Sequence, residues 1–224
     1  MSHTKSIVLL GHSCSGKSPT GAALAAWLNA REVGAFHFDF GSCLRDVASG
    51  NTAAGLSSQQ CARVVAVMDG RVLGEHDRDI ALGVLTTFMA RNMVFPDREW
   101  LICNGLPRTI AQAGWLVQAG VLPVVVLFLD CSVPVARERK RLAEMGKGHE
   151  DRSDRPDKDE DIFIRKTESF RRETLPLVEW YSRQGVSTVT VPVHVHTTPE
   201  QIIARAEPLL LAHAVPPRRQ DPAR

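Results

Sequence analysis

Eight residues near the amino terminus have the spacing of a phosphate-binding loop. Gly11–Ser18 reads GHSCSGKS, which matches the pattern G-x-x-x-x-G-K-[ST]. Its glycines allow a tight turn in which backbone N–H groups point at phosphate oxygens. In this pattern Lys17 reaches the β- and γ-phosphates of a nucleotide, and Ser18 offers its hydroxyl to Mg²⁺. The predicted nucleotide-binding residues are Gly11, Ser13, Cys14, Ser15, Gly16, Lys17 and Ser18.

Proline at position 19 departs from the usual loop. The backbone N–H after the Ser/Thr often meets the α-phosphate, and proline has no N–H to give. Proline is tolerated in the first turn of a helix, so the local fold is unaffected. The hydroxyl of Thr20 is the candidate replacement for the missing donor.

Two arginines stand just beyond other apolar runs. Arg45 ends HFDFGSCLR, and Arg108 lies in NGLPRTIAQ. A fixed guanidinium binds phosphate through two parallel hydrogen bonds. Beside a phosphate loop, the pair predicts a second phosphate site; the alternative is that each is a solvated surface residue.

The elements that must position these side chains alternate along the chain. Apolar runs typical of buried parallel strands are Ser6–Leu10, Ala35–Asp39, Trp100–Cys103, Val124–Leu129 and Thr188–Val193. Helical patterns cover Lys17–Ala30, Ser58–Met68, Glu75–Arg91, Thr109–Ala119, Pro134–Met145, Lys158–Gln184 and Pro199–His213. Alternation of strand and helix predicts an α/β fold with a doubly wound parallel sheet.

Two stretches interrupt the alternation and are expected over the carboxyl edge of the sheet, where ligands bind. Residues 41–96 form a long helical insertion, and residues 144–158 are polar without an apolar period. We expect one domain over residues 1–213 and a disordered tail over 214–224.

Composition gives no general reason to expect nucleic-acid or membrane partners. The 224 residues include 27 Lys and Arg and 25 Asp and Glu, for a net charge of +2. Five cysteines without a C-x-x-C pair indicate free thiols in a reducing cytosol. No run resembles a signal peptide or approaches the roughly 20 apolar residues of a spanning helix, so a cytoplasmic location is expected.

The order of these motifs resembles the nucleoside monophosphate kinase family, most closely adenylate kinase in its short-lid form. The family's G-D-x-L-R is similar to residues 41–45, and its D-G-F-P-R-T-x-x-Q to residues 104–112. Its lid motif R-x-D-D, with a later arginine, is similar to residues 155–158 with Arg165, and its T-x-P-L-x-x-Y-Y to residues 173–181. The resemblance covers about residues 5–212. It implies a five-stranded P-loop sheet with a helical insertion that binds the monophosphate and a short lid.

The resemblance also implies an activity and residue roles. The γ-phosphoryl of Mg²⁺·ATP would pass to a nucleoside monophosphate, with AMP favoured, in a monomeric enzyme. The residues implied at the transferring phosphoryl are Lys17, Arg108, Arg139, Arg155 and Arg165. Those implied at the monophosphate are Phe40, Arg45, Arg71, Leu73, Gly105, Arg108 and Gln112, with Gln112 on the adenine. Arg137, Arg139 and Arg141 are close enough that all three could form a solvated helix face. The short lid holds no cysteine, which excludes a zinc-bound lid.

Several positions depart from the family pattern. Asn104 replaces the aspartate that orients Mg²⁺-bound water, and we expect it to hold that water through its carbonyl. Ser42 and Lys158 replace two further aspartates, and Phe40 replaces a threonine. Phe40 and Ser42 leave open a P-loop kinase with another small acceptor. Asn104, Lys158 and Pro19 leave open a nucleotide-binding regulatory protein with weak turnover.

Overall fold

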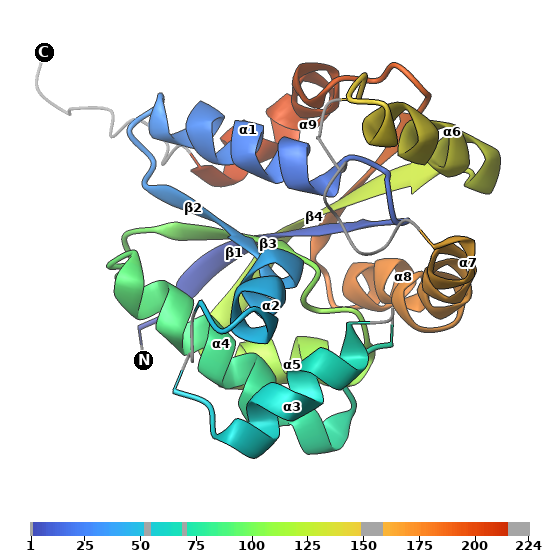
Figure 1. Ribbon diagram of the computed structural model, residues 1–224. Helices are drawn as coiled ribbons and strands as arrows, with labels where there is room; N and C mark the ends of the chain where they lie inside the picture. Colours follow the sequence, from blue (N-terminus) through green and yellow to red (C-terminus); the bar gives the residue numbers. More distant parts are fainter. Residues whose placement is uncertain (1, 52–54, 69–70, 149–158, 215–224) are drawn as a thin grey trace, which may run out of the picture.

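A computed structural model describes residues 2–51, 55–68, 71–148 and 159–214. Its centre is a five-stranded sheet in the order β2-β3-β1-β4-β5, and every neighbouring pair is parallel (Figure 1). The strands are β1 (Thr4–Gly11), β2 (Ala35–Asp39), β3 (Trp100–Asn104), β4 (Val121–Cys131) and β5 (Ser187–Val193). The predicted α/β class and parallel sheet are confirmed.

The continuous apolar runs form strands because both faces of the sheet are covered. Figure 1 shows α1 (Lys17–Asn29), α6 (Val133–Glu144) and α9 (Pro199–Ala214) on one face. On the other face lie α4 (Arg78–Arg91), α5 (Ile110–Gln118) and α8 (Pro176–Arg183). Side chains alternate along β1, so Ile7 and Leu9 belong to one apolar core and Val8 and Leu10 to the other.

The order of the strands places a ligand site at the carboxyl end of β1. After β1 the chain passes to β2 and β3 on one side, and later to β4 and β5 on the other. Loops leaving β1 and its neighbours therefore separate at this point, which opens a crevice at the edge. The phosphate loop lies there, between β1 and α1.

The predicted excursion between β2 and β3 is helical, but its first helix was not foreseen as a separate element. Helix α2 (Phe40–Ala48) begins directly after β2, because Asp39 accepts a hydrogen bond from Ser42 N at 3.0 Å and caps it. Helix α3 (Ser58–Val67) follows, and a 3-10 turn, Glu75–Asp77, precedes α4.

The helix predicted for residues 158–184 is confirmed as helical between Glu160 and Arg183, although a π-helical turn divides it. Helix α7 (Glu160–Ser169) passes into a π-helical turn, Phe170–Thr174, before α8 starts at Pro176. Leu175 N donates to Phe170 O at 2.8 Å, a five-residue spacing. Pro176 has no N–H, so the helical hydrogen bonding cannot run through it without a break.

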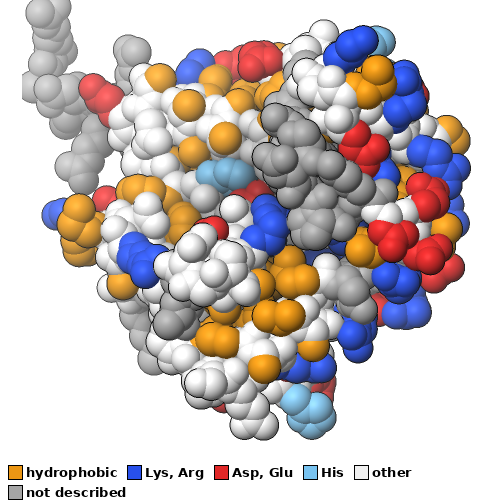
Figure 2. Space-filling model, viewed as in Figure 1, with side chains coloured by type: hydrophobic (Ala, Val, Ile, Leu, Met, Phe, Trp, Pro, Cys, Tyr) orange, Lys and Arg blue, Asp and Glu red, His pale blue; other side chains and the backbone are white. Residues whose placement is uncertain are grey.

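Charged side chains of both signs gather over α6 and α7 (Figure 2). They include the ion pairs Arg137–Glu160 and Arg141–Glu138, each with N–O distances of 2.7 Å. This face is therefore a mixed-charge surface rather than a basic patch. Within the described ranges, no helix is long and apolar enough to cross a membrane. Of the disordered tail predicted over residues 214–224, Ala214 is the last residue of α9, and residues 215–224 lie outside the described residues.

Candidate nucleotide-binding site

Two positions of the phosphate loop require glycine. Gly16 has φ +95° at the start of α1, and a Cβ there would lie 2.8 Å from Arg139 Nη2. At Gly11 a Cβ would lie 2.9 Å from the carbonyl oxygen of Leu129 on β4. Cys14 also adopts a left-handed conformation, with φ +64°, which is uncommon for a residue with a side chain. The loop is therefore tightly wound by close packing against β4 and α6.

Lys17 folds back along this loop. Its ammonium donates to the carbonyl oxygens of Gly11 and His12, at 2.8 and 2.7 Å. The expectation that Thr20 replaces the donor missing at Pro19 is wrong. Thr20 is fully buried, and its hydroxyl faces the interior rather than a cavity.

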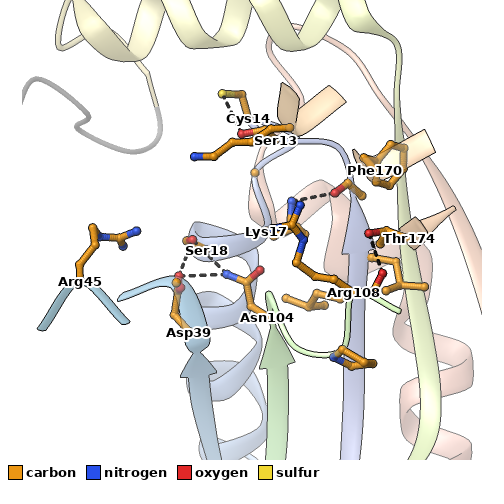
Figure 3. Close-up of a pocket in the computed structure, with 17 residues that line it drawn as sticks. Ser13, Cys14, Lys17, Ser18, Asp39, Arg45, Asn104, Arg108, Phe170 and Thr174 are labelled. Atoms are coloured by element: carbon orange, nitrogen blue, oxygen red, sulfur yellow. Dashed lines mark hydrogen bonds between the residues drawn. The ribbon is translucent and has the colours of Figure 1, made fainter. Parts of the chain in front are cut away.

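A cavity at the carboxyl edge, here called the phosphate-loop cavity, is lined by half of the predicted site residues (Figure 3). The predicted residues that line it are Gly11, Ser13, Cys14, Gly16, Lys17, Ser18, Arg45, Asn104 and Arg108. Ser15 is fully buried and lies outside the lining. Side chains from the ends of β2 and β3 also line the cavity, together with Lys166, Phe170 and Thr174.

Ser18, Asp39 and Asn104 form a hydrogen-bonded group in this cavity (Figure 3). Ser18 Oγ donates to Asp39 Oδ2 at 2.5 Å, and Asn104 Nδ2 donates to the same oxygen at 2.9 Å. Burial would raise the pKa of Asp39, but the bonds from Ser18 and from Ser42 N, with the charges of His37 and Arg45, lower it. Asp39 is therefore an anionic carboxylate beside the phosphate loop.

The structure changes the expectation for Asn104. We predicted that its carbonyl would hold metal-bound water, whereas its amide nitrogen faces Asp39 and donates also to Ser18 Oγ at 3.1 Å. The reason is the parallel pairing of β2 and β3, which sets Asp39 directly beside Asn104. An amide beside a carboxylate gains most by turning its donors toward it.

Arg108 stands between two cavities. Its guanidinium donates to Ser169 Oγ at 3.3 Å, and its carbonyl accepts from Thr174 Oγ1 at 3.0 Å. Burial lowers the pKa of this guanidinium and Glu173 raises it, although an arginine stays charged in either case. Figure 3 shows Arg108 and Arg45 on opposite sides of the Ser18–Asp39–Asn104 group.

The second space, the insertion cavity, lies against α2 and the chain after α3. It is lined by all the residues predicted at the monophosphate: Phe40, Arg45, Arg71, Leu73, Gly105, Arg108 and Gln112. Gln112 is buried, accepts from Arg108 N at 2.7 Å and donates to Leu73 O at 2.9 Å. One amide N–H and one lone pair of Gln112 are left by these two bonds.

Arg139 lies away from the phosphate-loop cavity. It lines a third space, the side cavity, with Pro19, Leu142 and His196. Its guanidinium donates to the carbonyls of Cys14, His194, Val195 and Thr197, at 2.9–3.1 Å. Arg137 and Arg141 instead pair with glutamates at the surface. Of the three candidates, Arg139 alone packs on the phosphate loop, where it holds backbone.

The two remaining predicted arginines are Arg155 and Arg165. Arg155 lies outside the described residues. Arg165 is exposed on α7, whereas the next residue, Lys166, lines both the phosphate-loop cavity and the insertion cavity. Consecutive side chains of a helix point about 100° apart, so one can line a cavity while the next faces solvent.

Sequence reasoning missed Asp39 and Lys166. Asp39 ends the predicted strand Ala35–Asp39, and a polar residue at the carboxyl end of a parallel strand is a signal of a ligand site. Lys166 had no local signal, because the choice between it and Arg165 depends on the rotation of α7.

Among known proteins, this chain is similar to several named adenylate kinase. It is 29% identical to adenylate kinase of Methylobacterium radiotolerans over 187 residues, 80% of this chain and 84% of that protein. It is 29% identical to human adenylate kinase isoenzyme 5 over 104 residues, and 33% identical to adenylate kinase of Bacteroides thetaiotaomicron over 94. Those matches span 46% and 40% of this chain, but 17% and 47% of the two proteins. No protein-family model matches the chain.

Taken together, the five-stranded parallel sheet and the loop between β1 and α1 form a P-loop α/β fold that is consistent with the fold of nucleoside monophosphate kinases. Within that class the chain is adenylate-kinase-like, as its motif order and its similarity to proteins of that name both indicate.

Proposed function

We propose that this protein transfers the γ-phosphoryl group of ATP to a nucleoside monophosphate, with AMP the favoured acceptor. One observation carries the proposal. Arg45, Arg108 and Lys166 line both the phosphate-loop cavity and the insertion cavity, so three cations stand where the two spaces meet. Phosphoryl transfer needs positive charge between two aligned phosphates, and little covalent chemistry from the protein.

The donor nucleotide and the acceptor nucleotide bind in different cavities. The loop N–H groups and Lys17 bind the phosphates of ATP, with the positive end of the α1 dipole behind them. The side cavity beside Arg139 is open to the rest of the donor nucleotide. Arg45 and Arg108 hold the acceptor phosphate, and the base lies near Gln112.

The chain's donor atoms fit Mg²⁺. The hydroxyl of Ser18, which the loop pattern assigns to the metal, lies 2.5 Å from a carboxylate oxygen of Asp39, and Mg²⁺ prefers oxygen ligands. When bound, the metal offsets charge on the phosphates. The protein's own cations supply the rest, and they cost little reorganisation because hydrogen bonds and packing already hold Lys17 and Arg108.

AMP is preferred on the similarity to proteins named adenylate kinase and on Gln112. An amide can pair with a donor and an acceptor on one edge of adenine. The two hydrogen bonds that Gln112 already makes fix the orientation of that amide.

A coupled assay with Mg²⁺·ATP and AMP, CMP, UMP or GMP, run beside calorimetric ATP binding, tests the proposal. We expect turnover with AMP above that with the other three acceptors. Greater turnover with CMP or UMP would contradict the choice of acceptor. ATP binding without turnover on any acceptor would contradict the kinase activity and favour a regulatory nucleotide-binding role.

A further inference from the structure

The end of β2 carries a carboxylate that the adenylate kinase resemblance does not account for. Asp39 and Asn104 are paired in the parallel ladder of β2 and β3, so their side chains leave the same edge of the sheet on the same face. Ser18, at the start of α1, completes the group. Three elements thus converge beside the phosphate loop, and Figure 3 shows their side chains pointing at one another.

The hydrogen bonds decide which atoms of this group can face a cation. Asn104 Nδ2 donates to both Ser18 Oγ and Asp39 Oδ2, and an amide nitrogen is a donor that cannot ligate a metal. Ser18 Oγ donates its proton to Asp39 and accepts from Asn104, which leaves it one lone pair for a cation. The anionic oxygen in this group therefore belongs to Asp39.

The carboxylate is also fixed from its other side. Asp39 Oδ1 accepts from Ser42 N at 3.0 Å, while Oδ2 takes the bonds from Ser18 and Asn104. Asp39 nonetheless lines the phosphate-loop cavity, as does Ser18. A hydroxyl and a fixed carboxylate, both oxygen ligands, suit a small hard cation that keeps several of its waters.

We infer that Asp39 is the acidic residue that positions the metal ion of the metal–nucleotide complex, and that Asn104 serves to anchor Asp39. This inference rests on the proposed use of Mg²⁺·ATP at the phosphate loop. The single carboxylate lies on β2, one strand farther from β1 than the family's aspartate at position 104 would be. The amide at position 104 fits this arrangement, because a second carboxylate there would be repelled by the carboxylate of Asp39.

Binding of Mn²⁺ with ADP provides a test that does not depend on turnover. Free Mn²⁺ is followed by electron paramagnetic resonance in the presence of ADP, and ADP binding in EDTA is measured separately by calorimetry. Asp39→Asn should weaken Mn²⁺ binding by at least about tenfold, as loss of a metal-orienting group does. ADP affinity without metal should change little. The amide can still accept from Ser42 N, so the cap of α2 is kept.

Two further variants sharpen the test. Asn104→Asp alone should not tighten Mn²⁺ binding, whereas Asp39→Asn combined with Asn104→Asp should recover much of it by moving the carboxylate to β3. The matched control is Asp46→Asn, which removes the same charge from an exposed position on α2 outside the phosphate-loop cavity. It should leave Mn²⁺ affinity at the wild-type level.

Three results would overturn the inference. Mn²⁺ affinity could be unchanged in Asp39→Asn, ADP affinity could fall equally with and without metal, or Asn104→Asp alone could tighten Mn²⁺ binding. The last result decides the matter even if Asp39→Asn does not fold. The proposed function fails differently: a wild type that binds Mn²⁺ and ADP through Asp39, but transfers phosphoryl to no monophosphate, would contradict the activity and support the inference.

Discussion

The imidazole of His12 lies 2.9 Å from the hydroxyl of Thr167 and joins the phosphate loop to α7. The two residues are 155 positions apart, and His12 packs between Phe163 and Phe170. The ring's other nitrogen donates to Ser13 O at 2.7 Å. The helix that carries Lys166 is therefore attached to the loop that carries Lys17.

This contact predicts a loss of stability in acid. Burial lowers the pKa of His12, with smaller effects of Lys17 and Arg171 in the same direction and of Ser13 O against it. Below about pH 6.5 the unfolded chain takes up a proton that the folded chain resists, so unfolding is favoured as the pH falls. Thermal unfolding midpoints between pH 8 and pH 5 should fall less in His12→Gln than in the wild type. Exposed His76→Gln is the control, and an equal fall in all three proteins would exclude His12 as the cause.

Lys17→Ala should lower phosphoryl transfer by about 10²- to 10³-fold, the typical cost of removing one preorganised charge from a transition state. The unfolding midpoint should change little, because Lys17 lies at a cavity rather than in a core. Lys5→Ala, at the opposite end of β1 and exposed, should keep the wild-type rate. Steady-state kinetics decide, and a Lys17→Ala rate near the wild-type value would contradict the assignment of the phosphate loop.

Lys166→Ala and Arg165→Ala compare two consecutive residues of α7. Lys166 lines both cavities and Arg165 is exposed, so we expect kcat to fall about 10- to 100-fold in Lys166→Ala and less than about threefold in Arg165→Ala. Measuring kcat and KM for both variants checks this prediction. The reverse order would mean that α7 presents its other face when substrates bind.

Gln112→Ala should raise the KM for AMP by about fivefold, the equivalent of one ordinary hydrogen bond. It should also destabilise the fold by about 1–3 kcal/mol, because Arg108 N and Leu73 O each lose a buried partner. KM values for AMP and CMP and urea unfolding give the two numbers. Gln118→Ala, exposed on the same helix, is the control. If the KM for CMP rises as much as that for AMP, Gln112 positions the backbone of Arg108 and Leu73 but does not distinguish adenine from cytosine.

The sequence by itself determined the sheet and its phosphate loop, because both depend on local pattern. Continuous apolar runs mark strands buried on two faces, and the run Trp100–Cys103 lies within β3, whose five residues are all buried. The loop between Gly11 and Ser18 needs glycine at fixed positions and a helix directly after it, all within one short segment. The resemblance also located the residues that line the insertion cavity.

Only the tertiary structure decided which polar groups meet. Asp39 and Asn104 are 65 positions apart and become neighbours through the pairing of β2 with β3. Arg139 is buried on the carbonyls of the phosphate loop and the chain after β5, while Arg137 and Arg141 stay at the surface. Lys166 lines the phosphate-loop cavity and Arg165 is exposed, because of the rotation of α7. The physical reason is the same in each case: a side chain's environment is set by the packing of whole elements, and a step of one residue is enough to change it.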